Sequence, residues 1–247
     1  MENFTAFETY GSERPSRWLV SCDHAANTVP KDVNGGTLEL PEAEMGRHIA
    51  YDLGAKGVAM RLGECLNGPV VCANFSRLVI DPNRGLSDPT LIMKLYDGTI
   101  IPANHPMDEA ERQRRIDAYW RPYHEAYEAL AARRNDTAIV AMHSFSPKLN
   151  GRAPRPWEIG ILHAGDCALG PALIKRLQQE ADLCVGDNEP YAGHLPGDAI
   201  DQHALQKGRA NVLIELRHDV IETDEQQQAW AERLAPILAE VLAEAGL

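Results

Sequence analysis

Short continuous apolar runs alternate along the chain with longer stretches in which apolar residues recur every three or four positions. Continuous runs of this kind are typical of strands that are covered on both faces of a sheet. They lie at 17–22 (RWLVSC), 138–142 (AIVAM), 158–163 and 211–217, with shorter β-rich runs at 70–73 and 78–80. We expect strands at these positions.

The stretches with helical spacing are longer. One or two helices are expected at 41–66, and further helices at 168–182 and 225–245. A long amphipathic helix is predicted at 108–134, where Pro122 is expected to kink or break it. One face of that helix carries Ile116, Tyr119, Trp120, Tyr123, Tyr127 and Leu130.

This alternation of strand and helix predicts an α/β fold. The expected architecture is a three-layer sandwich around a mixed, largely parallel central sheet, formed by a single domain over residues 1–247. In open sheets of this kind, functional sites gather at the carboxyl ends of the strands. The residues that follow the apolar runs are therefore the first place to look for chemistry.

Composition narrows the class of partner and compartment. The net charge of −12 disfavours binding to nucleic acid or anionic membranes, and no apolar stretch approaches the roughly 18 residues of a membrane span. The first residues contain no secretory signal. The five cysteines form no C-x-x-C pair, which favours free thiols in a reducing cytoplasm. We expect a soluble cytoplasmic protein with a small-molecule partner.

Polar side chains follow three of the apolar runs. His24 comes after the first run, His143 after the AIVAM run, and Glu215 lies inside the last one, VLIELR. A lone histidine at such a place is more often a hydrogen-bonded core or loop residue, and Glu215 alone could form a buried ion pair with Arg217. Taken together, however, two imidazoles and a buried carboxylate fit a zinc site with an open position for water.

A fourth polar segment spans 74–84 (NFSRLVIDPNR) and contains Arg77, Asp81, Asn83 and Arg84. Its Asp-Pro-Asn sequence marks a turn. The arginines could be ordinary surface residues near this turn. Alternatively, they form a carboxylate clamp, because a planar guanidinium makes two charge-assisted hydrogen bonds to a carboxylate.

Two other enzyme or binding classes find little support. There is no G-x-S-x-G elbow for a serine hydrolase, and neither G-x-G-x-x-G nor G-x-x-x-x-G-K-[ST] for a nucleotide-binding domain. Among weaker candidates, Ser144 is a hydrogen-bond partner for substrate, and His203 a substrate contact or second proton donor. His194 and His163 are further histidines that could approach the site.

The ordered set of motifs resembles the N-formylglutamate amidohydrolase family from about Val20 to Ile221. The segments are S-C-D-H-A-A-N-T-V-P (21–30), N-F-S-R-L-V-I-D-P-N-R (74–84), M-H-S-F-S-P (142–147), R-P-W-E-I-G-I-L (155–162), N-E-P-Y-A-G (188–193) and I-E-L-R-H-D-V-I (214–221), with His203 before the last. That family is similar in architecture to the zinc carboxypeptidases and aspartoacylases.

The resemblance implies a role for each matching residue. His24 and His143 resemble the two zinc histidines, and Asn27 stands where the related enzymes have a glutamate ligand. An amide is a poor zinc ligand, so Asp23 is the nearest substitute as the third ligand. Glu215 resembles the catalytic glutamate that acts as general base.

The arginines also have counterparts. Arg77 resembles the residue that polarises the scissile carbonyl, and Asn83 and Arg84 resemble the pair that grips the substrate α-carboxylate. The implied activity is hydrolysis, with one zinc ion per chain, of the N-formyl or N-acyl amide of a small acidic amino acid such as N-formyl-L-glutamate. The alternative is a degenerate family member that binds a carboxylated ligand without turnover.

Overall fold

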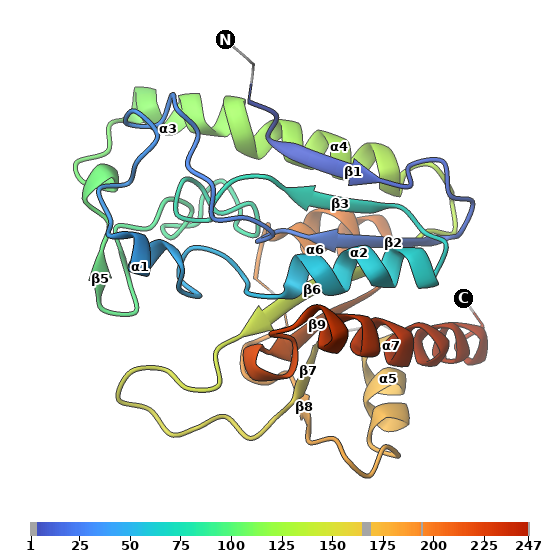
Figure 1. Cartoon of the computed structure of the whole chain (residues 1–247). Coiled ribbons are helices and arrows are strands. Elements are labelled where there is room, and N and C mark those ends of the chain that lie inside the picture. The colour runs from blue at the N-terminus through green and yellow to red at the C-terminus, as the bar shows by residue number, and fades with distance from the viewer. Residues whose placement is uncertain (1–3, 165–168, 194, 247) are drawn as a thin grey trace.

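A central mixed β-sheet organises the chain (Figure 1). The computed structural model describes residues 4–164, 169–193 and 195–246. Within these residues the sheet has seven strands in the order β1-β3-β2-β6-β9-β7-β8. The strands are β1 (Phe7–Tyr10), β2 (Trp18–Cys22), β3 (Val70–Ala73), β6 (Ala138–Phe145), β7 (Ile159–Leu162), β8 (Val185–Asp187) and β9 (Ala210–Arg217).

Parallel pairing dominates the middle of this sheet. β3, β2, β6 and β9 are parallel neighbours, whereas β1 is antiparallel to β3 and β7 is antiparallel to β9. β8 pairs parallel with β7. A separate hairpin consists of β4 (Leu95–Tyr96) and β5 (Thr99–Ile100). The predicted α/β fold with a mixed, largely parallel sheet is confirmed.

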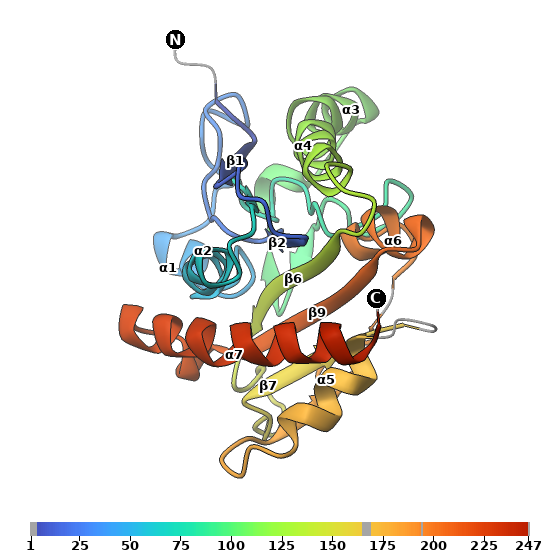
Figure 2. The ribbon, with the colours of Figure 1, turned by 90° about the vertical axis from the view of Figure 1, so that its right-hand side faces the viewer.

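Helices cover both faces of the sheet (Figure 2). The α-helices are α1 (Glu42–Met45), α2 (Ala55–Cys65), α3 (Glu109–Arg115), α4 (Arg121–Ala131), α5 (Leu169–Leu177), α6 (Ala199–His203) and α7 (Asp224–Glu244). Short 3-10 turns lie at η1 (Pro102–Asn104), η3 (Leu205–Lys207) and η4 (His218–Val220), and η2 (Ile116–Trp120) is a π-helical segment.

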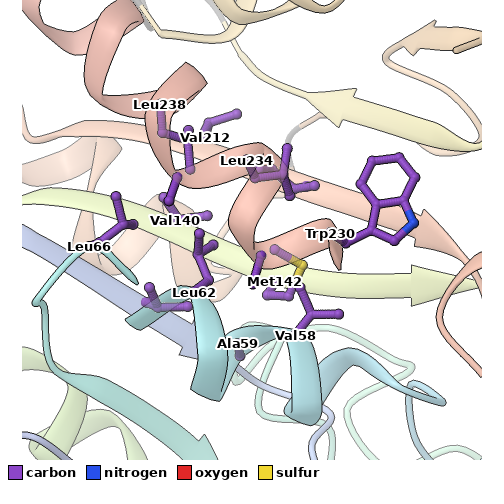
Figure 3. Close-up of a cluster of buried hydrophobic side chains, with 14 of the residues drawn as sticks. Val58, Ala59, Leu62, Leu66, Val140, Met142, Val212, Trp230, Leu234 and Leu238 are labelled. Atoms are coloured by element: carbon purple, nitrogen blue, oxygen red, sulfur yellow. The ribbon is translucent and has the colours of Figure 1, made fainter. Parts of the chain in front are cut away.

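Each face of the sheet has its own apolar core because successive strand residues point to opposite sides. One core places β2, β6 and β9 side chains against α2, α5 and α7; Figure 3 shows Val140, Met142 and Val212 meeting Leu62 and Leu234. On the other face, Leu19, Ile139 and Leu213 pack with the aromatic side of α4. Central strands buried on both sides explain the continuous apolar runs of the sequence.

One sequence prediction is wrong, and two others are made more precise by the structure. The 78–80 run is not a strand but part of a turn, although Leu78, Val79 and Ile80 are fully buried; burial and not pairing accounts for its apolar character. Residues 108–134 form α3, η2 and α4 in succession, and the π-helical segment ends immediately before α4, which has Pro122 in its first turn. The 41–66 stretch, for which one or two helices were expected, forms the two helices α1 and α2, and Gly54 caps α2 with a φ of 75°.

No described helix combines the length and apolar character that a membrane crossing requires.

Candidate metal and substrate site

The ends of the central strands bring distant polar residues together. His24 follows β2 by two residues, and His143 and Glu215 lie near the carboxyl ends of β6 and β9. Asp52 lies in the segment between α1 and α2, and its side chain meets these residues. The rule that sites form at the carboxyl ends of parallel strands therefore holds here.

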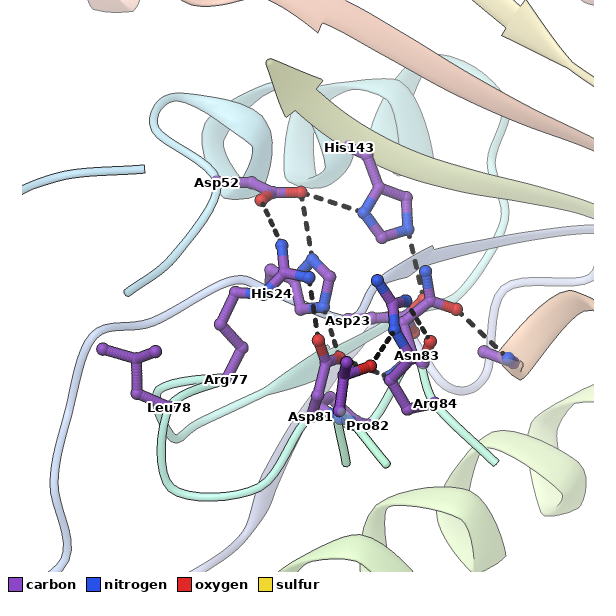
Figure 4. A network of polar contacts seen from close by, with 12 residues as sticks. Asp23, His24, Asp52, Arg77, Leu78, Asp81, Pro82, Asn83, Arg84 and His143 are labelled. Atoms are coloured by element: carbon purple, nitrogen blue, oxygen red, sulfur yellow. Dashed lines mark hydrogen bonds and ion pairs between the residues drawn. The ribbon is translucent and has the colours of Figure 1, made fainter. Parts of the chain in front are cut away.

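His24, Asp52 and His143 form a buried cluster suited to a cation (Figure 4). Each offers one ligand atom, and these atoms lie within 4.8 Å of one another. Asp52 Oδ2 is 3.3 Å from His24 Nδ1 and 2.9 Å from His143 Nδ1. The two imidazole centroids are 5.0 Å apart. Two imidazole nitrogens and a carboxylate oxygen are a donor set that zinc accepts.

The second ring nitrogen of each histidine faces another carboxylate. His24 Nε2 lies 2.7 Å from Asp81 Oδ1, and His143 Nε2 lies 3.2 Å from Asp23 Oδ2. The Tyr123 hydroxyl donates in turn to Asp23. Metal-binding histidines commonly donate their other N–H to a carboxylate, which fixes the tautomer and leaves the first nitrogen as ligand. Both histidines are therefore oriented with Nδ1 toward Asp52.

The charge of the cluster also fits a divalent cation. Burial alone would raise the pKa of Asp52, but the neighbouring His24 and His143 lower it well below its usual value. The pKa of Asp81 is likewise lowered, because Arg77 and His24 outweigh burial. With Asp23, three buried carboxylates lie beside one buried guanidinium in this cluster. This excess of negative charge favours a bound cation.

Arg77 belongs to the same network. Its Nη2 donates to Asp81 Oδ2 at 2.8 Å, and its Nη1 lies 3.5 Å from Asp52 Oδ1. The guanidinium carbon is 5.5 Å from the ring centroid of Tyr96 in the β4–β5 hairpin. These contacts hold a fixed positive charge next to the histidine cluster.

Glu215 lines the same cavity and has no ion pair with Arg217. Arg217 instead contacts Asp219 at 2.7 Å and Glu158 at 3.2 Å. Within the described part of the chain, the buried Oε2 atom of Glu215 has no hydrogen-bond partner. Burial raises the pKa of Glu215 to about 8, against the opposing effect of His143. A buried carboxylate left without a partner is costly to fold and is a mark of functional sites.

Asn83 and Arg84 are held by the backbone around them. The backbone N–H of Asn83 donates to Asp81 Oδ1 at 2.9 Å, and the side-chain oxygen of Asn83 accepts from the backbone N–H of Ala199 at 3.2 Å. Arg84 Nη1 donates to the Asn83 carbonyl at 2.7 Å. Both residues line the cavity. The structure thus places His24, His143, Glu215, Arg77, Asn83 and Arg84 around one cavity.

The two sequence candidates for the third ligand lie elsewhere. Asn27 is exposed, and its side-chain amide donates to the Met45 carbonyl at 2.9 Å. Asp23 is buried, but it faces Nε2 of His143 on the side away from Asp52. Asp52 is therefore the carboxylate that completes the cluster.

The weaker candidates have different surroundings. Ser144 lines the cavity, with its hydroxyl donating to the Leu53 carbonyl at 2.8 Å. His203 does not line it: the imidazole stacks on Tyr127 and lies 2.8 Å from His124. His163 pairs with Asp187 at 2.9 Å. His194 lies outside the described residues.

His124 connects this interior stack to the clamp. Its Nε2 lies 2.9 Å from the Pro82 carbonyl, and the neighbouring Trp120 indole N–H donates to the Arg84 carbonyl at 3.0 Å. Helix α4 and the preceding π-helical segment therefore hold the backbone of residues 82–84 in place through these two hydrogen bonds. His203 contributes to this support and not to the cavity wall.

The cavity itself has a volume of about 290 Å³, which suits a small molecule. Its walls also include residues that the sequence did not single out as site candidates: Asp52, His48, Tyr96, Ser146 and Tyr191. Asp52 gave no signal because it lies within a stretch read as helix. The Tyr191 segment was recognisable only through its motif.

Comparison with known proteins agrees with the geometry. Residues 16–222 match the family model described as N-formylglutamate amidohydrolase. An N-formylglutamate deformylase of Pseudomonas putida is 27% identical over 207 residues, covering 75% of this chain and 73% of that protein. The crystal structure of a gene product from Agrobacterium tumefaciens superposes with a TM-score of 0.92 at 34% identity, covering 99% of this chain and 98% of that one.

A more distant solved structure shares the fold. It is an N-formylglutamate amidohydrolase from Ralstonia eutropha JMP134, with a TM-score of 0.56 and 21% identity over 96% of this chain and 99% of that one.

Proposed function

The chain belongs to the N-formylglutamate amidohydrolase family, and on that premise we propose that it is a zinc-dependent amidohydrolase. Its proposed reaction is the hydrolysis of the N-formyl or N-acyl amide of a small acidic amino acid such as N-formyl-L-glutamate. The observation that carries the proposal is the buried cluster of His24, Asp52 and His143 at the floor of a cavity that also contains Glu215.

His24 Nδ1, His143 Nδ1 and an oxygen of Asp52 would hold the zinc ion. Zinc bound by three protein ligands lowers the pKa of water and polarises a carbonyl group. Asp81 and Asp23 keep the two imidazoles in the orientation that this binding needs. Zinc is proposed over Mg²⁺ or Ca²⁺ because imidazole nitrogen is a preferred ligand of zinc, whereas those cations favour oxygen.

Glu215 is the proposed general base. Its Oε2 atom is buried and has no hydrogen-bond partner among the described residues, so it is available to a water molecule. Glu215 would take a proton from the attacking water and return it to the amide nitrogen as the C–N bond breaks. A cation beside the carboxylate favours its ionised form and thus lowers the pKa that burial raises to about 8.

Arg77 and Arg84 have different proposed roles, one in stabilising charge and the other in binding the substrate. Arg77, fixed by Asp81, is placed to stabilise negative charge on the carbonyl oxygen of the scissile amide. Arg84 and Asn83 would bind the α-carboxylate, so that binding energy orients the reacting bond. Arg84 suits this role because, among the described residues, no carboxylate forms an ion pair with it.

The test is a substrate panel with controlled metal content. Purified protein is depleted with a chelator, reloaded with zinc, and assayed for release of formate or acetate from N-formyl and N-acetyl amino acids. We expect one zinc per chain and zinc-dependent hydrolysis of N-formyl-L-glutamate. Saturable binding of the acidic compounds without hydrolysis in the zinc-loaded protein would overturn the enzyme proposal and favour a binding protein.

A further inference from the structure

Arg155 lies in the connection between β6 and β7, in contact with three residues that line the cavity. Its Nη1 donates to the Ser146 carbonyl at 3.0 Å, and also lies 3.3 Å from the Ser146 hydroxyl and 3.4 Å from the Tyr191 hydroxyl. The guanidinium carbon is 5.6 Å from the ring centroid of Phe145 and 5.2 Å from that of Tyr191. Two aromatic rings and one hydrogen-bonded nitrogen therefore restrict its orientation.

The Nε and Nη2 edge of the guanidinium has no protein partner among the described residues. In residues 4–164, 169–193 and 195–246, no hydrogen bond or ion pair engages Nε or Nη2 of Arg155, and neither atom is a buried unpartnered group. The Nε and Nη2 atoms form an edge that can accept both oxygens of one carboxylate. Stacking against aromatic rings reduces the entropy lost when such a pair forms.

The three arginines around the site differ in their partners. Arg77 is neutralised by Asp81 and Asp52. Arg84 contacts only a carbonyl and the Thr90 hydroxyl, and Arg155 only a carbonyl and two hydroxyl groups. Two of the three cations thus lack a protein carboxylate among the described residues, and each is available to pair with a carboxylate of a ligand.

Arg155 is connected to the cavity through the side chains that hold it. Ser146, Phe145 and Tyr191, which hold it, all line the cavity wall. Its charge opposes the effect of burial on the pKa of Glu215, as do the charges of His143 and Arg77. Arg155 and Arg84 come from chain segments far apart in sequence, one after β6 and the other after β3; Arg84 lines the cavity, and Arg155 contacts its wall.

We propose that Arg155 is a specificity-determining residue that binds the side-chain carboxylate of a dicarboxylic N-acyl amino acid, while Arg84 and Asn83 hold the α-carboxylate. This inference rests on the proposed function, because it assigns the second acidic group of the same substrate. In this proposal each substrate carboxylate pairs with a different arginine. Arg84 binds the α-carboxylate, which every N-acyl amino acid has, whereas Arg155 distinguishes an acidic side chain from a neutral one.

The test compares substrates that differ only in this second carboxylate. N-formyl-L-glutamine is nearly isosteric with N-formyl-L-glutamate but carries a neutral amide. We expect the zinc-loaded wild type to favour the glutamate compound by about 10- to 100-fold in kcat/KM, as the loss of a charge-assisted pair predicts. In Arg155→Gln this ratio should fall to near one, mainly through a higher KM for the glutamate compound. Arg155→Lys should keep part of the preference.

A charge-matched control and an independent measurement complete the design. Arg152→Gln removes the same charge from an exposed position of the same connection and should leave the ratio unchanged. Calorimetric binding of L-glutamate and L-glutamine to wild type and Arg155→Gln measures the same preference without turnover. Loss of that binding preference in Arg155→Gln supports the inference even if the wild type hydrolyses neither compound. Absence of hydrolysis would contradict only the proposed function.

The inference is overturned if Arg155→Gln keeps the wild-type ratio in the assay or the wild-type preference in binding. It is also overturned if both compounds lose activity equally, since that pattern indicates a structural role. Because a ratio does not depend on the fraction of folded protein, partial misfolding of a variant does not obscure either result.

Discussion

His143 and Glu215 are register partners on the parallel strands β6 and β9. Their pairing places an imidazole of the candidate metal cluster next to the one carboxylate whose pKa burial raises to about 8. Both side chains line the cavity. The sheet itself therefore fixes the position of Glu215 relative to His143.

Glu215→Gln should abolish most turnover while leaving zinc in place. The amide has nearly the same shape but cannot accept the proton, and general-base catalysis contributes about 10²- to 10⁴-fold. Turnover of the zinc-loaded variant and its metal content, measured by elemental analysis, check this expectation. Loss of zinc from the variant would instead indicate that Glu215 is a zinc ligand.

Asp52→Ala should lose zinc, whereas Asn27→Ala should retain it. Asp52 supplies the oxygen that lies between both imidazole Nδ1 atoms, while the Asn27 side chain is exposed and bonded to a backbone carbonyl. Equilibrium dialysis against zinc measures both variants under the same conditions. Normal affinity in Asp52→Ala together with weak binding in Asn27→Ala would restore the ligand set expected from sequence.

Arg84→Ala should raise KM for N-formyl-L-glutamate about 10- to 100-fold with a smaller change in kcat, because a charged hydrogen bond to the substrate is lost in both the ground state and the transition state. Steady-state kinetics separate the two constants. An equal fall in kcat at unchanged KM would place Arg84 in transition-state stabilisation.

Tyr123→Phe should weaken zinc binding about 10-fold, since the lost hydroxyl orients Asp23 and, through it, His143. Tyr127→Phe is the matched control: its hydroxyl donates to Ser21 at 2.8 Å, and its ring is buried in the same helix. Competition with a zinc-binding dye compares the two affinities. Similar losses in both variants would indicate a general effect on α4.

Stability should depend on the protonation of His124. Burial lowers the pKa of His124 to about 3 from 6.5, so the unfolded chain binds this proton more readily than the folded one between these pH values. The contribution to stability is complete above pH 6.5 and is lost as the pH falls toward 3. The free energy of unfolding should fall by at most about 1.4 kcal/mol for each pH unit between pH 6 and 4.

His124→Gln removes this titration but keeps a donor for the Pro82 carbonyl. Urea unfolding at pH 7, 6, 5 and 4 should therefore show a shallower loss of unfolding free energy for the variant than for wild type. Other titrating groups are common to both proteins and cancel in the comparison. Parallel curves would contradict the assignment.

The sequence predicts the central strands of the fold well because β2, β6 and β9 are buried on both faces and read as unbroken apolar runs. The edges are harder. β1 has four residues of mixed burial and β8 has three, which is too short for any periodicity. The apolar turn at 78–80 carries the same signal as a strand, because periodicity cannot distinguish burial in a turn from burial in a sheet.

The candidate site divides in a similar way. His24, His143 and Glu215 were detectable because polar residues at the ends of buried strands are unusual. Asp52 was not, since an aspartate among residues with helical spacing looks like an ordinary solvent-facing position. The sequence makes His203 a candidate substrate contact or second proton donor, whereas its ring stacks on Tyr127 in the interior and does not line the cavity.

The carboxylate of Asp81 touches an imidazole, a guanidinium and the amide of Asn83 at once. A substitution of Asp81 therefore disturbs His24, Arg77 and the turn at residues 82–84 together. None of these three neighbours can be altered alone through this position.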